Sequence, residues 1–287
     1  ETGVVGQQMK LLDDGRHIVL RTYDHSTTKP GNLELWDYID DKLVNEFIDT
    51  EYHLGFVAIN VSQDNSLIVA SNQKYILIFD NQLNLLQRIE TTESYYGLAI
   101  EELFISPDNT TILAYTKAHI YKWDVETGEK TLKWQPYSPF GFKEITAFNI
   151  SDDFSIMAIG SLANLNEYKL IMLVSYSNLE IIYHDHREGF KYRDFAFDIE
   201  DKLMFACTES NISSYSLDNF EILNSKGRVG GFWENPEIDL LEIWLHDIII
   251  AKNHNQLFVG SFYDLDDDYF GLDYDFKITK IVRPEVL

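Results

Sequence analysis

The densest group of potential metal ligands is the acidic segment FYDLDDDYFGLDYDF at 262–276. Four of its aspartates follow the spacing of positions 1, 3, 5 and 12 of a calcium-binding loop: Asp264, Asp266, Asp268 and Asp275. Such a loop needs a glycine at position 6, where Tyr269 stands, and a glutamate at position 12. We therefore expect a solvated loop between two strands, with contact between a basic partner and Asp266, Asp267 and Asp268 as the functional alternative.

A second group of potential ligands is the tetrapeptide Tyr183-His184-Asp185-His186. Two histidines separated by one residue, with no third ligand, make a poor zinc site, and we expect a connecting loop here. The sequence contains no Gly-x-Ser-x-Gly, no His-Glu-x-x-His and no glycine-rich phosphate loop. No hydrolase motif therefore marks a catalytic site, although a triad assembled from distant strands would leave no such trace.

Three further carboxylates share a position relative to a recurring turn. Glu102, Asp194 and Asp247 each lie three residues before the apolar residue that precedes that turn. Carboxylates brought together in one place can bind a cation such as Ca²⁺, or raise one another's pKa by like-charge repulsion. Their chemistry therefore depends on the repeating elements that position them.

These elements recur six times along the chain. The turn of each copy is marked by an acidic or amide residue, in the order Asp14, Asp64, Asp108, Asp153, Glu200 and Asn253. The period of roughly 44 to 53 residues is that of a four-stranded propeller blade. Each copy alternates apolar and polar residues over four to seven positions between turns rich in Asp, Asn, Gly and Ser, which predicts strands, and no segment shows a helical stripe.

The best-preserved copy, ISPDNTTILAYTKAHIYKWDVETGEK at 105–130, resembles the WD40-type β-propeller family. The resemblance rests on Ser106-Pro107-Asp108, Leu113-Ala114, Trp123-Asp124 and Thr127-Gly128-Glu129, with Trp36-Asp37 and Phe79-Asp80 at the Trp-Asp position of two other copies. The family's Gly-His pair is missing from every copy. The resemblance implies that the Trp packs between blades and that the Asp secures a turn, so that both are architectural.

The resemblance predicts an all-β fold in which residues 1–287 form a single propeller domain. Six blades are expected at about 5–50, 53–92, 96–136, 141–187, 190–225 and 244–287, with a loop insert at 225–244, and a seventh blade is the alternative. The last copy ends after its third strand, at ITKIV before Pro284. We expect residues 4–12 to supply its missing outer strand as well as the first inner one, or a partner's strands to complete an open ring.

In a propeller the first strands line a central channel, so Glu102, Asp194 and Asp247 would face it. Lys143, Arg193 and His246 lie close to them in the sequence, which favours a hydrated channel wall over a cation site. The insert at 225–244 is the other candidate site. Its apolar and aromatic residues, among them Phe232, Trp233, Leu241 and Trp244, are expected either to bind a partner or to cover the last blade.

The formal charge of −24 makes nucleic acid and anionic membrane surfaces unlikely partners and suits a partner with a basic patch. No apolar run is long enough to span a membrane. The single cysteine, Cys207, and the usual location of the family favour an intracellular protein. The non-Met start and the sequons at Asn60, Asn109, Asn149 and Asn211 leave a secreted one open, although two sequon serines, Ser62 and Ser151, belong to the repeat itself.

Two functions are compatible with these features. The first is a non-catalytic scaffold whose loops and channel mouth hold a protein or peptide, either alone or as a member of a larger complex, as the WD40 resemblance implies. The second is a metal-dependent propeller enzyme or ligand-binding propeller that uses the channel carboxylates, similar to six-bladed lactonase-type propellers. The Trp-Asp and Thr-Gly-Glu turns favour the first function, whereas the alignment of Glu102, Asp194 and Asp247 supports the second.

Overall fold

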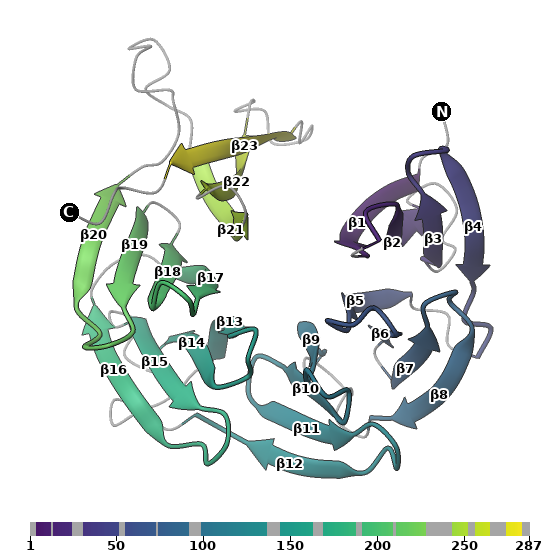
Figure 1. The fold of residues 1–287 in the computed structure, drawn as a ribbon, viewed down its shortest axis with the longest axis horizontal. Helices are drawn as coiled ribbons and strands as arrows, with labels where there is room; N and C mark the ends of the chain where they lie inside the picture. The colour runs from purple at the N-terminus through teal and green to yellow at the C-terminus, as the bar shows by residue number, and fades with distance from the viewer. Residues whose placement is uncertain are drawn as a thin grey trace. The chain divides into compact units, whose positions relative to one another are not determined.

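A computed structural model shows antiparallel β-sheets whose strands follow one another in the chain (Figure 1). The structure describes residues 4–12, 14–24, 31–51, 55–72, 74–91, 99–136, 144–162, 169–187, 191–208, 211–227, 243–251, 256–264 and 274–282, the last three ranges as backbone. These residues contain strands and turns and no helix, as the sequence predicts. Within them no helix is long and apolar enough to cross a membrane.

The chain divides into two compact units, Glu1–Pro136 and Tyr137–Leu287. The first unit holds three four-stranded sheets, each with its strands in chain order. They consist of β1 (Val4–Leu11), β2 (His17–Asp24), β3 (Leu33–Asp37) and β4 (Lys42–Phe47); β5 (Phe56–Val61), β6 (Leu67–Asn72), β7 (Tyr75–Asp80) and β8 (Leu85–Glu90); and β9 (Glu102–Ile105), β10 (Thr111–Tyr115), β11 (Ile120–Asp124) and β12 (Lys130–Trp134).

The second unit holds two four-stranded sheets and one sheet of three strands. They consist of β13 (Glu144–Ile150), β14 (Ile156–Leu162), β15 (Lys169–Ser175) and β16 (Ile181–Arg187); β17 (Tyr192–Asp198), β18 (Leu203–Thr208), β19 (Asn211–Ser216) and β20 (Ile222–Gly227); and β21 (Ile243–Ala251), β22 (Gln256–Asp264) and β23 (Tyr274–Val282). The described residues thus form five sheets of four strands and one of three, and the interpretation of these sheets as propeller blades stays a prediction. Their closure into a ring stays a prediction.

The core of each unit lies between successive sheets. One cluster joins the first two sheets through residues such as Leu35 and Phe79, and a second joins the next two through residues such as Ile78 and Trp123. A third cluster in the second unit joins the sheets of β13–β16 and β17–β20. A single sheet buries too little apolar surface alone, so neighbouring sheets stabilise one another as repeats do.

Two asparagines tie neighbouring sheets together by hydrogen bonds. The Nδ2 of Asn60 on β5 donates to the carbonyl oxygen of Leu103 on β9 at 2.6 Å, and the Nδ2 of Asn149 on β13 donates to that of Phe195 on β17. Each asparagine stands four residues before the aspartate of its turn, so the bond belongs to the repeat. Both are sequon residues, and their side-chain amides serve this contact.

Two predicted boundaries were wrong. The Tyr183–His186 segment is part of strand β16 and not a connecting loop, because the pairing of β15 with β16 continues from Ile181 to Arg187. The insert at 225–244 is shorter than expected, since residues up to Gly227 belong to β20 and Trp244 lies on β21, paired with Phe262. In both segments the polar or aromatic composition predicted a loop, but backbone pairing with the neighbouring strand continues through these residues.

Candidate functional site

The three predicted carboxylates occupy one register position on the first strands of three sheets. Glu102 is paired with Tyr115, Asp194 with Cys207 and Asp247 with Gly260. Asp194 and Asp247 belong to the second unit and Glu102 to the first. The equivalent register of these three carboxylates on their first strands was therefore predicted correctly. That they share a metal site stays a prediction.

The first-strand carboxylates contact basic side chains. Within the first unit the Nζ of Lys10 on β1 lies 3.8 Å from the Oε1 of Glu102. Within the second, the Nζ of Lys191 lies 3.9 Å from the Oε1 of Glu144, a residue that sequence reasoning missed. All four side chains are partly exposed, so each pair offsets charge and adds little stability. Among the residues that the structure describes, no three or more His, Cys, Asp or Glu side chains gather closely enough to hold a metal ion.

The aspartates of the first turns are used by the turns themselves. The Ser62 hydroxyl donates to Asp64 at 2.7 Å and the Ser106 hydroxyl donates to Asp108 at 2.6 Å. These bonds, together with backbone and side-chain donors two residues after each aspartate, hold the pKa of both carboxyls below the usual range. Ser151 and Asp153 repeat the arrangement at 2.7 Å. This recurring chemistry closes turns and is not catalytic machinery.

Trp123 and Asp124 of the third sheet lie in the core and at a turn, respectively. Trp123 is buried in the cluster between the second and third sheets, and Phe79 and Tyr215 are buried at the same position of other copies. The Oδ1 of Asp124 accepts hydrogen bonds from the backbone N–H and the hydroxyl of Thr127. Trp36 differs, because it is half-buried and its indole N–H donates to Glu34.

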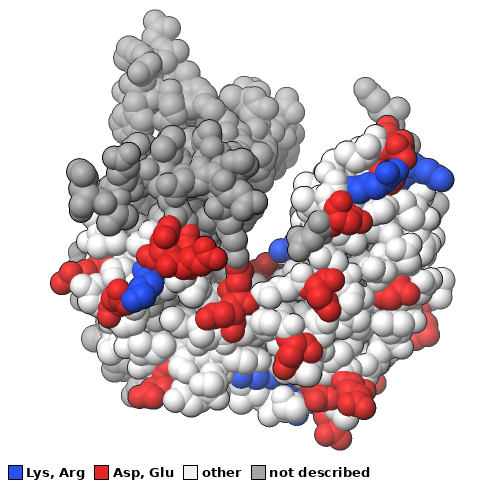
Figure 2. All heavy atoms as spheres, in the orientation of Figure 1, with Lys and Arg blue, Asp and Glu red and all other residues white. Residues whose placement is uncertain are grey.

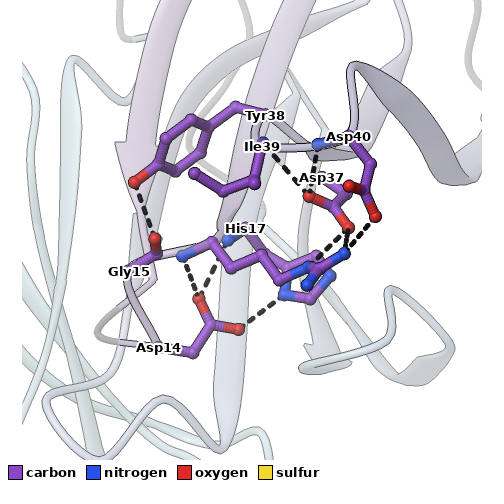
Figure 3. Close-up of polar contacts among 8 residues, drawn as sticks. Asp14, Gly15, His17, Asp37, Tyr38, Ile39 and Asp40 are labelled. Atoms are coloured by element: carbon purple, nitrogen blue, oxygen red, sulfur yellow. Dashed lines mark hydrogen bonds and ion pairs between the residues drawn. The ribbon is translucent and has the colours of Figure 1, made fainter.

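A charged cluster holds the hairpin between β3 and β4 against the turn between β1 and β2 (Figure 3). The guanidinium of Arg16 contacts Asp37 and Asp40, and the hydroxyl of Tyr38 donates to the carbonyl oxygen of Gly15 at 2.7 Å. The ring Nδ1 of His17 lies 2.5 Å from Asp14, a contact that lowers the pKa of Asp14 to about 2. These contacts fix the exposed tip of this hairpin.

Every described fourth strand carries a β-bulge at the same position. The ladder skips one residue in each of β4, β8, β12, β16 and β20: Val44, Leu86, Thr131, Ile182 and Leu223. In every case the skipped residue directly follows the residue that pairs with the third-strand Trp position, so the bulge is a feature of the repeat; the residues at that position are Trp36, Phe79, Trp123, Val174 and Tyr215. Bulges on edge strands interrupt the row of backbone groups that another strand would need in order to pair there.

The bulged residue is aliphatic and exposed in four of these five strands. Val44, Leu86, Ile182 and Leu223 expose 41%, 58%, 43% and 50% of their surface, and the preceding Leu43, Leu85 and Ile181 expose 39%, 39% and 37%. In β12 the position holds Thr131. We call the residue pairs 43–44, 85–86, 181–182 and 222–223 the edge-strand aliphatic pairs. Large contiguous apolar patches are typical of interaction surfaces, and the recurrence of these pairs at one position of the repeat makes them candidate residues for such a surface.

The edge-strand aliphatic pairs were missed by sequence reasoning, although a signal was present. Each pair begins five or six residues after the third-strand Asp or Ser, as Leu43 follows Asp37 and Ile181 follows Ser175. Asp and Glu side chains cover more of the described surface than Lys and Arg do on the face drawn in Figure 2.

The predicted partner-binding residues lie mostly outside the described residues. Phe232, Trp233 and Leu241, and the acidic residues Asp266, Asp267 and Asp268, fall in ranges that the structure does not describe. Two of the potential calcium ligands lie on strands, Asp264 paired with Tyr274 and Asp275 with Tyr263. Strand β22 ends at Asp264 and β23 begins at Tyr274, and residues 265–273 between them lie outside the described part of the chain.

No family model matches this chain, and no curated protein matches its sequence.

Proposed function

We propose that the chain is a WD40-like β-propeller that acts as a non-catalytic scaffold for a protein or peptide partner. Support for the propeller comes from six consecutive sheets with a common register and from the buried aromatic residues between them. Support for the WD40 likeness comes from the turns of Asp64, Asp108 and Asp124. In each of them the carboxylate accepts a hydrogen bond from a Ser or Thr hydroxyl of the same turn.

The observation that carries the scaffold proposal is the recurrence of the edge-strand aliphatic pairs. Burying an exposed aliphatic side chain against a partner contributes roughly 25 cal/mol for each Å² removed from water. These residues are exposed at one register position of the repeat, where they can contact a partner. The bulge at the same position prevents the edge strand from pairing with a strand of another protein. Protein partners are the class that this combination suits.

The acidic surface narrows the class of partner. A formal charge of −24 disfavours nucleic acid and anionic lipid and favours a partner with basic residues. The segments 228–242 and 265–273, with Phe232, Trp233 and Asp266 to Asp268, stay candidate contacts for the same partner. Their residues lie outside those that the structure describes.

Affinity purification from the native source tests the proposal when the wild type is compared with one designed variant. The variant replaces the four bulged aliphatic residues by serine: V44S, L86S, I182S and L223S. We expect partners enriched by the wild type to be lost by this variant and retained by T131A, a matched change at the fifth bulge. Retention of the same partners by the fourfold variant, with an unchanged melting temperature, would contradict the proposal.

A further inference from the structure

One face of the first sheet carries apolar side chains across all four strands. Residues that are paired directly in an antiparallel sheet point to the same face, with Cβ atoms about 4.5–5.5 Å apart, and alternate residues of a strand share a face. The pairing of β1 to β4 therefore places two rows of paired residues side by side: Leu11, Ile18, Trp36 and Leu43 in one row, and Met9 and Leu20 in the other. We call these six residues the first-sheet face.

The first-sheet face is open, whereas the same face of the next two sheets is buried. The register equivalents of Met9, Ile18 and Trp36 are Ile59, Ile68 and Phe79 in the second sheet and Leu103, Ile112 and Trp123 in the third. Those six equivalents expose at most 2% of their surface. Met9 and Leu11 expose 61% and 57%, and Ile18, Leu20 and Trp36 are partly exposed. The described residues thus leave much of this face uncovered.

The repeat shows what kind of structure covers this face. The buried face of the second sheet packs in one cluster with Val19, Leu33 and Leu35 of the first sheet. The buried face of the third sheet packs in the same way with residues at the same register positions of the second sheet, Val69, Ile76 and Ile78. In both cases the covering structure is a β-sheet that presents aliphatic side chains at alternate positions.

Two glutamates border the apolar rows. Leu20 is paired with Glu34 on β3, and Glu34 is paired with Glu46 on β4, so both carboxylates lie on the first-sheet face. The indole N–H of Trp36 donates to Glu34 and the side-chain amide of Asn32 donates to Glu46, each at 2.6 Å. Like charges directly opposite each other destabilise a strand pair, and a lysine or arginine beside them would offset this repulsion. A second copy of this chain would instead add its own glutamates and is disfavoured.

From the open apolar rows and the paired glutamates, we propose that the first-sheet face binds a β-sheet of a partner protein. Aliphatic side chains of that sheet pack against Leu11, Ile18 and Trp36, and a lysine or arginine of the same sheet faces Glu34 and Glu46. The contact is the face-to-face packing of two sheets, as between the sheets of the first unit, and adds no strand to an edge. This inference rests on the proposed scaffold function and assigns it a surface and a partner chemistry.

Oxidation of methionine by hydrogen peroxide tests whether the face is free in the isolated full chain. The chain has four methionines, and Met157, Met172 and Met204 are buried and serve as internal controls. We expect Met9 to be oxidised at least about tenfold faster than these three. Protection of Met9 at every protein concentration would show that another segment of this chain covers the face. Protection at high concentration alone would identify a second copy, and either result would overturn the inference.

Three disulfide-closed hairpin peptides of equal length then serve as the partner sheet. One carries leucine and a single lysine on one face, the second replaces the lysine by glutamate and the third replaces the leucines by serine. Measured by fluorescence anisotropy against the full chain, the leucine–lysine hairpin should bind at least about tenfold more tightly than either of the others. It should also slow the oxidation of Met9. Equal binding of the serine hairpin, or no binding by any hairpin, would overturn the inference.

Variants locate the binding surface. L11S should weaken binding of the leucine–lysine hairpin at least about tenfold, whereas I39S, a change at an equally exposed residue outside the face, should leave it within about twofold. Both side chains are exposed, so neither variant should change the melting temperature. E46K should weaken binding of the lysine hairpin and strengthen that of the glutamate hairpin. Equal effects of L11S and I39S would overturn the inference.

These outcomes are distinguishable from those of the proposed function. The scaffold function is tested with partners from the native source and with serine at the four bulged positions. Loss of those partners in the fourfold variant, together with no binding by the hairpins, would overturn the inference alone. Binding of the leucine–lysine hairpin that L11S abolishes would support the inference even if the fourfold variant kept every native partner.

Discussion

The hydrogen bond between Asn149 and Phe195 allows a quantitative test of how the sheets hold together. The variant N149A removes the Nδ2 donor to the carbonyl oxygen of Phe195 on the next sheet. It also removes the Oδ1 that accepts from the backbone N–H of Ile150 at 2.8 Å. Asn149 is half-buried and Phe195 is buried, so water replaces these partners poorly. Leaving a buried polar group without its partner costs about 1–3 kcal/mol.

That loss is measurable by thermal and urea unfolding followed by circular dichroism. For a cooperative unit of roughly 150 residues, 1 kcal/mol corresponds to about 2–4 °C in melting temperature, so N149A should melt about 2–12 °C lower. The control is N178A in the same unit, where the Asn178 amide is exposed and bonds only within its own turn, to Glu180. We expect N178A to change stability by less than about 0.5 kcal/mol. A melting temperature of N149A within about 1 °C of the wild type would refute the reasoning.

Three further predictions follow from the turns, a glycine and the first strands. Hydrogen bonds lower the folded-state pKa of Asp64 and Asp108 below 3.8, so the contribution of these carboxylates to stability is present above about pH 4 and is lost as pH falls. In urea titrations, D64N/D108N should therefore lose less unfolding free energy than the wild type between about pH 5 and pH 2. An equal loss of unfolding free energy in both proteins would count against this prediction. G160A places a Cβ 2.6 Å from the Cβ of Tyr192 on β17 and should lower the unfolding free energy by about 1–3 kcal/mol. A denaturant midpoint equal to that of the wild type would contradict this prediction. Titration with Ca²⁺ should give no saturable heat and no thermal stabilisation, because Lys10 lies beside Glu102. A Ca²⁺-dependent rise in melting temperature that E102Q abolishes would instead support a metal site at Glu102.

Local sequence predicts the turns and the strand register because both depend on nearby residues. The turns of Asp64 and Asp108 form within five residues, from a Ser-x-Asp pattern whose hydroxyl and carboxylate bond to each other. The same spacing placed Glu102, Asp194 and Asp247 at one register position. The buried Trp123 followed from the repeat, since a large aromatic at a fixed position needs a neighbouring sheet to cover it.

Pairing between distant residues could not be predicted. Arg16 contacts Asp37 and Asp40 across more than 20 positions, and no local pattern marks that choice. His184 was assigned to a loop by its polar neighbours, although its backbone pairs with Met172 on β15. The bulges at Val44 and Leu86 arise where the fourth strand meets the third, so their exposure depends on the assembled sheet.

The central claim is that the edge-strand aliphatic pairs form the surface that holds a protein partner. A photo-crosslinking amino acid placed at Leu86, and in a matched experiment at Thr131, tests this claim directly in extracts of the native source. Both positions are exposed bulges of a fourth strand, and they differ in the presence of an aliphatic pair. The claim predicts a saturable crosslink to a distinct protein from position 86 and little from position 131. Equal crosslinking from both positions, or none from position 86, would contradict it.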